Sequence, residues 1–271
     1  MKYSLILPLV LISLLFTAGC GGDDDVAEPK GTFELNFITR VSGEGFQNRL
    51  IYQNINGRKF FIENMKMYVG NITLVKEDDT EVKLSDVELF DLGNGGVANK
   101  VNHGEGSFAI FEGVEPGNYK GVKFGIGVPP ELNRTVRPSD FEEDEPLADL
   151  GMWWSWLTGY RFLSIDGRID TTQANLGENF QGSLVYHTGI DELYRELEFT
   201  DARHAFTLYT ETEKQFFVEI DFNRLFFNDN DTINMVVQNQ THSTPKGSDE
   251  YKLAEKITDN LVNGALFGYT N

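Results

Sequence analysis

Hydrophobic and polar residues alternate in short runs from residue 32 to residue 237, and turn-forming Gly, Asn and Asp separate these runs. In the first run, Phe33, Leu35 and Phe37 alternate with Glu34 and Asn36. One face of such a strand is apolar and the other faces solvent, as in a sheet that covers a core. The predicted strands are 32–41, 49–53, 60–75, 81–92, 107–114, 119–128, 153–165, 183–186, 195–199, 205–209, 215–222 and 232–237.

The end of the chain has a different period. Apolar residues recur three or four positions apart from Leu253 to Leu266, which predicts one helix with a single apolar stripe. Its polar face includes Asp259 and Asn260 as well as Lys256, so it lacks the basic band of a helix that lies on lipid. The pattern therefore predicts an all-β fold, an antiparallel β-sandwich with one C-terminal α-helix.

The first thirty residues predict export and anchoring. Lys2 precedes an apolar run at 5–16 that ends in Thr-Ala-Gly-Cys at 17–20, the layout of a signal peptide with a lipobox. The run is shorter than the roughly 20 residues that a membrane-spanning helix needs. We expect residues 1–19 to be cleaved and Cys20 to carry a lipid anchor.

The residues after the lipobox predict a tether. Residues 20–30 form an acidic, polar segment with a proline, expected to be flexible, and 31–271 are expected to form one domain. The predicted location is the outer membrane, facing the periplasm or the cell surface. The acidic residues of the tether are either a surface-export signal or a solvated linker.

Composition narrows the classes of partner. The chain has 23 Lys and Arg against 42 Asp and Glu, a formal net charge of −19. This excess of acid argues against nucleic acid and anionic lipid and is compatible with cations or a basic protein. Cys20 is the single cysteine, so no disulfide forms within the chain.

Enzyme signatures are absent from the sequence. It contains no Gly-x-Ser-x-Gly elbow, no His-Glu-x-x-His pair and no phosphate-binding loop. The glycines at 93–98 lack a β-α-β context, and the acidic turn at 229–231 lacks the rest of a calcium loop. We expect a binding protein and not an enzyme.

The segment 151–162 reads Gly-Met-Trp-Trp-Ser-Trp-Leu-Thr-Gly-Tyr-Arg-Phe and holds all three tryptophans. In one continuous strand, Trp154 and Trp156 share a face while Trp153 points to the other. The rings could simply fill a core, since aromatic side chains supply much of the burial in a β domain. They could also form a binding surface.

This segment resembles the hallmark of the MbnP-like family, periplasmic or surface copper-binding proteins first associated with methanobactin operons. Weaker similarities follow in the family's order at 63–74, 114–119, 124–128, 216–227 and in the terminal helix at 254–260, so the resemblance extends over roughly residues 31–267. It implies a copper site near the tryptophans, where Trp154 or Trp156 is oxidised to kynurenine by a di-haem partner enzyme of the MauG kind. Opening the ring turns an indole, which can only donate a hydrogen bond, into an aryl amine and a ketone with lone pairs.

The resemblance also selects the metal ligands. His187, in Tyr-His-Thr-Gly, and His242, in Thr-His-Ser, are the candidates, because imidazole is a natural ligand for copper. His103 and His204 have no such support, and Met152 could add a soft thioether or belong to the core.

Two departures from the family leave other functions open. Some relatives have a histidine two residues after the modified tryptophan, where this chain has Trp156, and many have histidines after the terminal helix, where this chain has none. One alternative is a metal-free module that presents its aromatic strand to a carbohydrate or a protein. Another is a redox partner of a di-haem peroxidase that stores no metal.

Overall fold

A computed structural model describes residues 29–93, 96–97, 107–155, 157–172, 180–228 and 231–271. The predicted signal peptide, most of the tether with Cys20, and the acidic turn at 229–230 lie outside the described residues. So do Trp156 and His103. In the described parts of the chain, no helix is long and apolar enough to cross a membrane.

Strands make up most of the secondary structure in the described residues. The strands are β1 (Gly31–Val41), β2 (Glu44–Gly45), β3 (Tyr52–Gln53), β4 (Lys59–Lys76), β5 (Glu81–Asp91), β6 (Gly96–Val97), β7 (Ser107–Val114), β8 (Gly117–Ile126), β9 (Trp153–Ser155), β10 (Gly159–Ile169), β11 (Gly182–Gly189), β12 (Arg195–Phe199), β13 (Phe206–Leu208), β14 (Glu213–Asp221), β15 (Phe227–Asn228), β16 (Asp231–Thr232), β17 (Gln240–Thr241) and β18 (Leu266–Thr270). The α-helices are α1 (Pro130–Asn133), α2 (Phe222–Phe226) and α3 (Asp249–Asn260).

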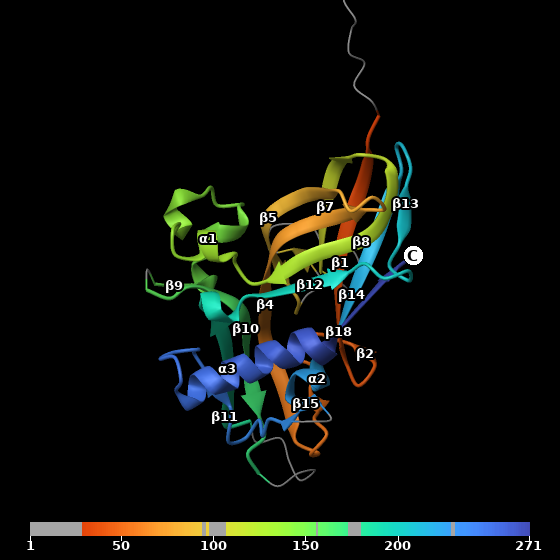
Figure 1. The fold of residues 1–271 in the computed structure, drawn as a ribbon. Coiled ribbons are helices and arrows are strands. Elements are labelled where there is room, and N and C mark those ends of the chain that lie inside the picture. The colour runs from red at the N-terminus through yellow and green to blue at the C-terminus, as the bar shows by residue number, and fades with distance from the viewer. Residues whose placement is uncertain (1–28, 94–95, 98–106, 156, 173–179, 229–230) are drawn as a thin grey trace, which may run out of the picture.

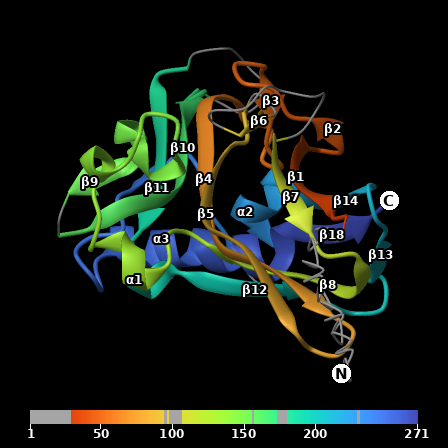
Figure 2. The same ribbon diagram turned by 90° about the horizontal axis from the view of Figure 1, so that it is seen from above.

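Two sheets face each other. The smaller one has the order β18–β14–β1–β2, with β7 also paired to β1, and the larger, curled one has the order β12–β8–β4–β10–β11–β17 with short strands at its sides. Figure 2 shows β4, β10 and β11 on one side of the molecule and β1, β7, β14 and β18 on the other. The predicted β-sandwich with a C-terminal helix is therefore confirmed.

Most strand pairs are antiparallel, as predicted, but two are parallel. β1 lies parallel to β14, and β11 lies parallel to β17. Neither pair is connected by a hairpin: long stretches of chain separate the partners, which is what parallel pairing requires. Alternation within a strand shows which face is buried but does not show which strand lies beside it.

Aromatic side chains join the two sheets. Phe37 of β1 lies 4.7 Å from Phe90 of β5 and 5.8 Å from Phe124 of β8, measured between ring centroids, and both contacts are edge-to-face. These three rings are buried. Offset and edge-on ring pairs add to the free energy that burial of their area already supplies, so this contact fixes the spacing of the sheets.

The C-terminal segment is a helix followed by a strand. α3 begins after Ser248, whose side chain accepts a hydrogen bond from the Tyr251 N–H, and it packs against β11, β17 and α2 (Figure 1). The helix was predicted to reach Leu266, but α3 ends at Asn260. A π-helical turn at Leu261–Ala265 follows, and Leu266 is the first residue of β18.

β18 is the outermost strand of the smaller sheet, and a buried histidine meets it there. His204, which is 5% exposed, has its Nε2 3.1 Å from the Gly268 carbonyl oxygen. Its ring stands edge-on to Phe199 at 5.3 Å. His204 therefore ties the turn before β13 to the last strand of the chain.

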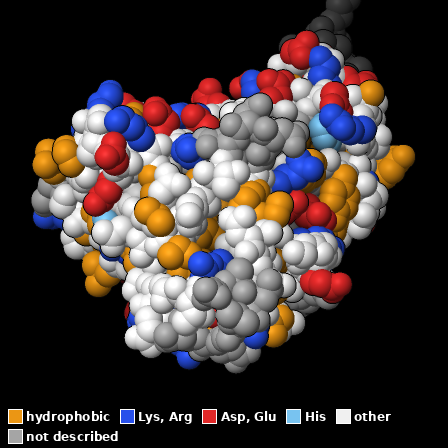
Figure 3. All heavy atoms as spheres, turned by 90° about the horizontal axis from the view of Figure 1, so that it is seen from below, with side chains coloured by type: hydrophobic (Ala, Val, Ile, Leu, Met, Phe, Trp, Pro, Cys, Tyr) orange, Lys and Arg blue, Asp and Glu red, His pale blue; other side chains and the backbone are white. Residues whose placement is uncertain are grey.

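The segment between α1 and β9 contains short helical turns, and the predicted strand at 153–165 is a hairpin. The loop includes 3₁₀ turns at Pro138–Asp140, Pro146–Ala148 and Leu150–Met152 and lies beside β9 (Figure 1). β9 ends at Ser155 and β10 starts at Gly159, whose φ of 75° suits a glycine in a tight turn. On the face in Figure 3, hydrophobic side chains are scattered between polar ones, and acidic and basic side chains are interspersed along one rim.

Candidate metal centre

The candidate site lies on the outward face of the larger sheet where β10 and β11 pair. His187 lies opposite Ser164, and Gly189 lies opposite Arg161. Because side chains alternate along a strand, His187 and Gly189 point to the same face of β11. This face carries the polar side chains of both strands, whereas Ile165 and Tyr186 point into the core.

The β9–β10 hairpin holds Trp154 over this face. The buried Asn133 at the end of α1 accepts a hydrogen bond from the Tyr160 N–H at 2.8 Å and donates one to Asp191 at 2.8 Å. Asn133 thus connects the hairpin with the segment that follows β11. A Cβ atom on Gly189 would lie 2.8 Å from Cζ3 of Trp154, so the indole ring packs directly on glycine backbone.

Three of the side chains predicted from the sequence converge at this point. The Trp154 ring centroid lies 6.2 Å from that of His187 and 6.4 Å from that of His242. The two imidazole centroids are 5.4 Å apart, with the rings almost perpendicular at 88°. The fourth predicted residue, Trp156, lies outside the described residues.

His187 is the buried member of the pair. Its side chain is 7% exposed, and Nε2 lies 2.8 Å from Oδ1 of Asp166. Its other ring nitrogen, Nδ1, is buried and has no hydrogen-bond partner. Buried polar atoms are nearly always paired, so an unpaired Nδ1 is an exception that a bound group would explain.

Asp166 is held from both sides. Its Oδ2 accepts hydrogen bonds from Ser164 at 3.1 Å and Asn64 at 3.4 Å. Burial works to raise the pKa of this carboxyl, but its hydrogen bonds with His187, Asn64 and Ser164 outweigh burial and leave its pKa lowered. Asp166 therefore faces His187 as a carboxylate.

His242 is the exposed member, with 46% of its side chain open to solvent. It follows β17, and its Nδ1 lies 3.5 Å from Oε2 of Glu250 in the first turn of α3. The same carboxylate oxygen accepts the backbone N–H of His242 at 3.2 Å. The neighbouring Ser243 donates to the His187 carbonyl and accepts from the Gly189 N–H, both at 3.1 Å, so this loop is tied to β11.

A cation covers the indole. The guanidinium carbon of Arg161 lies 5.6 Å from the Trp154 ring centroid, and Nη1 donates to the Gly151 carbonyl at 2.8 Å. Burial lowers the pKa of Arg161, which nevertheless stays cationic because the guanidinium pKa is so high. Arg161 and Gly189 together fix the plane of the Trp154 ring.

Some functional side chains were not found from the sequence. Asp166 interrupts an apolar strand, which was a usable signal, whereas Glu250 and Asn133 have none, because their roles depend on contacts between distant segments. Met152 is 1% exposed and packs with Leu147 and Tyr160, so the structure gives it a place in the core.

The donor set consists of two imidazoles beside an aromatic ring. Within the described ranges, no three His, Cys, Asp or Glu side chains are grouped so that they could hold a metal. A structural zinc site needs four ligands of this kind, and calcium needs six or more oxygens. Imidazole is a ligand for zinc, copper, iron and nickel, and any of these ions would need a further donor from a neighbouring group here.

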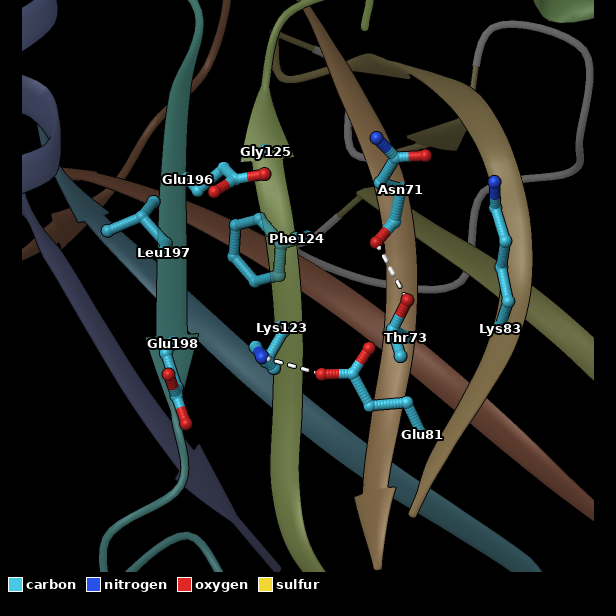
Figure 4. A pocket seen from close by; sticks show the side chains of 10 residues that line it. All are labelled: Asn71, Thr73, Glu81, Lys83, Lys123, Phe124, Gly125, Glu196, Leu197 and Glu198. Atoms are coloured by element: carbon cyan, nitrogen blue, oxygen red, sulfur yellow. Dashed lines mark hydrogen bonds and ion pairs between the residues drawn. The ribbon is translucent and has the colours of Figure 1, made fainter. Parts of the chain in front are cut away.

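A separate hollow of about 660 Å³ lies over β12, β8, β4 and β5 (Figure 4). Lys123 from β8 pairs with Glu81 from β5 at 2.7 Å across this hollow. None of the residues that line it belongs to the Trp154, His187 and His242 cluster. The pair reaches over β4, which lies between β8 and β5, and such paired charges are typical of a solvated sheet face.

Comparisons with known proteins agree with the fold and with the family that the sequence resembles. The family model described as MbnP matches residues 30–245. A solved structure, MbnP from Methylosinus trichosporium, superposes with a TM-score of 0.52 at 14% sequence identity, over 89% of this chain and 99% of that one. No curated protein sequence matches this chain.

Proposed function

Because the chain belongs to the MbnP family, we propose that it binds copper and that His187, His242 and Trp154 form the site. The observation that carries the proposal is the convergence of these three rings from three separate segments, with centroids 5.4 to 6.4 Å apart. Three segments far apart in the chain contribute one aromatic and two imidazole groups to a single point. Packing of a hydrophobic core does not require two imidazoles beside an indole.

The residues present fit the metal. The buried Nδ1 of His187 has no protein partner, and a metal ion would supply the missing acceptor of its lone pair. His242 would be the second ligand, at the solvent side. Bound copper would supply a redox-active cation, while the protein's own part is to orient the imidazoles and to cover the ion with Trp154.

A product of Trp154 would supply the third donor. In this proposal a di-haem peroxidase delivers the oxidising equivalents of two molecules of hydrogen peroxide, each reduced to water. Two oxygen atoms add across Cγ and Cδ1 of the indole and break the bond between them, and hydrolysis then releases formate to leave kynurenine. The aryl amine and ketone of kynurenine have the lone pairs that indole lacks. Trp156 remains the other candidate named from the sequence.

The cellular role that follows is copper acquisition, storage or tolerance, by binding and without catalysis. The signal-like N-terminus supports a lipoprotein anchored through Cys20 at the outer membrane and facing the periplasm or the cell surface. The partly buried Trp154 beside two histidines favours copper over the metal-free aromatic module, which would present an open platform.

Intact mass and metal content of the protein purified from its native host test this function. We expect bound copper, together with the mass gain of kynurenine in the peptide 151–161, with fragment ions that assign it to Trp154. Unmodified tryptophans without copper would overturn the proposal and favour the metal-free module.

Variants locate the copper within the protein. His187→Ala and His242→Ala should each abolish tight binding of one copper ion. His204→Gln is the matched control, because His204 meets β18 and not the Trp154 ring. Equal loss in all three variants would show that the effect is not specific to the site.

A further inference from the structure

Each candidate ligand has a carboxylate near one ring nitrogen, at hydrogen-bond distance in His187 and at the longer distance of an ion pair in His242, and the nitrogen differs between the two. Asp166 meets Nε2 of His187, while Glu250 meets Nδ1 of His242. We infer that Asp166 and Glu250 are positioning residues that select the metal-binding nitrogens, Nδ1 in His187 and Nε2 in His242. This inference rests on the proposed copper site and adds which atoms bind and which residues decide it.

The argument for His187 starts from the chemistry of neutral imidazole. One of its nitrogens carries the proton and the other carries the lone pair. A carboxylate can only accept a hydrogen bond, so Asp166 at 2.8 Å holds the proton on Nε2. The lone pair is then on Nδ1, the buried atom without a partner. Ligating histidines commonly donate their second N–H to a carboxylate in this way.

The position of Asp166 is itself determined by its neighbours. Ser164 on the same strand and Asn64 on β4 both donate to Oδ2, which leaves Oδ1 for His187. The two strands belong to the middle of the larger sheet. The carboxylate therefore cannot turn without breaking hydrogen bonds to two further side chains.

His242 is oriented from the helix side. Oε2 of Glu250 accepts the His242 backbone N–H at 3.2 Å and lies 3.5 Å from Nδ1 of the ring. Glu250 is in the first turn of α3, where a negative charge is favoured by the helix dipole. The hydroxyl of Thr241 donates to the Glu250 carbonyl, which joins the loop to the helix. Nε2 is then the nitrogen turned away from Glu250.

The two orienting contacts differ in strength. Asp166 lies at 2.8 Å from a ring that is 7% exposed, while Glu250 lies at 3.5 Å from a ring that is 46% exposed. Contacts open to water contribute less than buried ones. His187 is consequently the fixed ligand, and His242 the ligand that can swing to admit or release the ion.

Nitrogen NMR of the metal-free protein tests the assignment directly. Long-range ¹H–¹⁵N correlations on protein with ¹⁵N-labelled histidine, at a pH where the rings are neutral, report which nitrogen carries the proton. We expect the Nε2–H form in His187 and the Nδ1–H form in His242. Asp166→Asn should remove the preference in His187 and leave His242 unchanged, a signature that simple loosening of the fold would not give.

Copper affinity supplies the second readout. Titration of Cu(I) against a competing chelator should show a loss of about 10- to 100-fold in Asp166→Asn, and a smaller loss in Glu250→Gln. Glu255→Gln, five residues further along α3, is the matched control and should bind like wild type.

The outcomes separate the two proposals. Reversed tautomers, or wild-type affinity in a folded Asp166→Asn variant, would overturn the positioning roles. Wild-type protein that binds no Cu(I) while both tautomers are as expected would overturn the copper function and support the carboxylates as the groups that orient the rings.

Discussion

Gly189→Ala is the most informative single substitution, because it adds one methyl group at the point where Trp154 rests on β11. The new Cβ would lie 2.6 Å from the Tyr160 carbonyl oxygen and 2.8 Å from Cζ3 of Trp154. The first neighbour is backbone of the paired strand β10 and has little freedom to move. The indole is the group that can give way.

The magnitude follows from the two close contacts. Forcing an extra methyl group into packed surroundings costs about 1–3 kcal/mol. If the indole moves aside, the cost appears as weaker copper binding, and about 1.4 kcal/mol corresponds to a tenfold change in affinity. If the strand moves instead, the cost appears as a lower free energy of unfolding.

Two measurements on the same variant divide this cost. Urea denaturation gives the change in the free energy of unfolding, and Cu(I) titration against a chelator gives the change in binding. We expect the two losses together to reach about 1–3 kcal/mol, accompanied by a shift in tryptophan fluorescence. Gly264→Ala is the matched control, because nothing lies within 4 Å of its Cβ. A Gly189→Ala variant that matches wild type in both measurements would refute the packing of Trp154 on Gly189.

Three further predictions follow from described contacts. Asn133→Ala leaves the Tyr160 N–H without its acceptor and should lower the free energy of unfolding by about 1–3 kcal/mol in urea, whereas an unchanged midpoint would contradict a role in holding the hairpin. Burial raises the pKa of Tyr68 and Tyr160, and that of Tyr194 to about 12. Ultraviolet titration should therefore find these three side chains protonated at about pH 11. Reversible ionisation of the three below that pH would contradict their burial. The pKa of Asp166 is lowered from its ordinary 3.8, so its carboxylate adds stability above about pH 4 that is lost as the pH falls through the folded-state pKa. In acid denaturation, Asp166→Asn should lack this part of the loss of stability. The same dependence of stability on acidic pH in variant and wild type would contradict this role.

The sequence predicted the layers of the fold better than its connections. Alternation in Phe33, Leu35 and Phe37 gave the buried face of β1 correctly, but the parallel partner β14 is about 180 residues away and leaves no local signal. Residues 232–237 were predicted as a strand, yet only Thr232 belongs to β16. The Asn234 side chain accepts the Val236 N–H there and forms a local turn that competes with strand pairing.

For the site, the motif led to the rings and the structure supplied what orients them. His187, His242 and Trp154 were named from short motifs, and the structure brings them together. The turn that separates Trp154 from β10 was missed because the apolar run from Trp153 to Ile165 reads as continuous, although Thr158-Gly159 offered a turn signal. Asp166 could not be matched to His187, because the register that places Ser164 opposite His187 depends on pairing between two strands and is not visible in the sequence.

The contact between His204 and Gly268 bears on how the protein behaves at high concentration. β18 reads Leu-Phe-Gly-Tyr-Thr, without charge or proline, and an uncharged outermost strand is the kind that recruits strands from other molecules into aggregates. The His204 imidazole is hydrogen-bonded to the Gly268 carbonyl oxygen, so this main-chain acceptor is unavailable to a strand of a second molecule. A histidine outside the Trp154, His187 and His242 cluster thus blocks one hydrogen-bonding position on the edge of the smaller sheet.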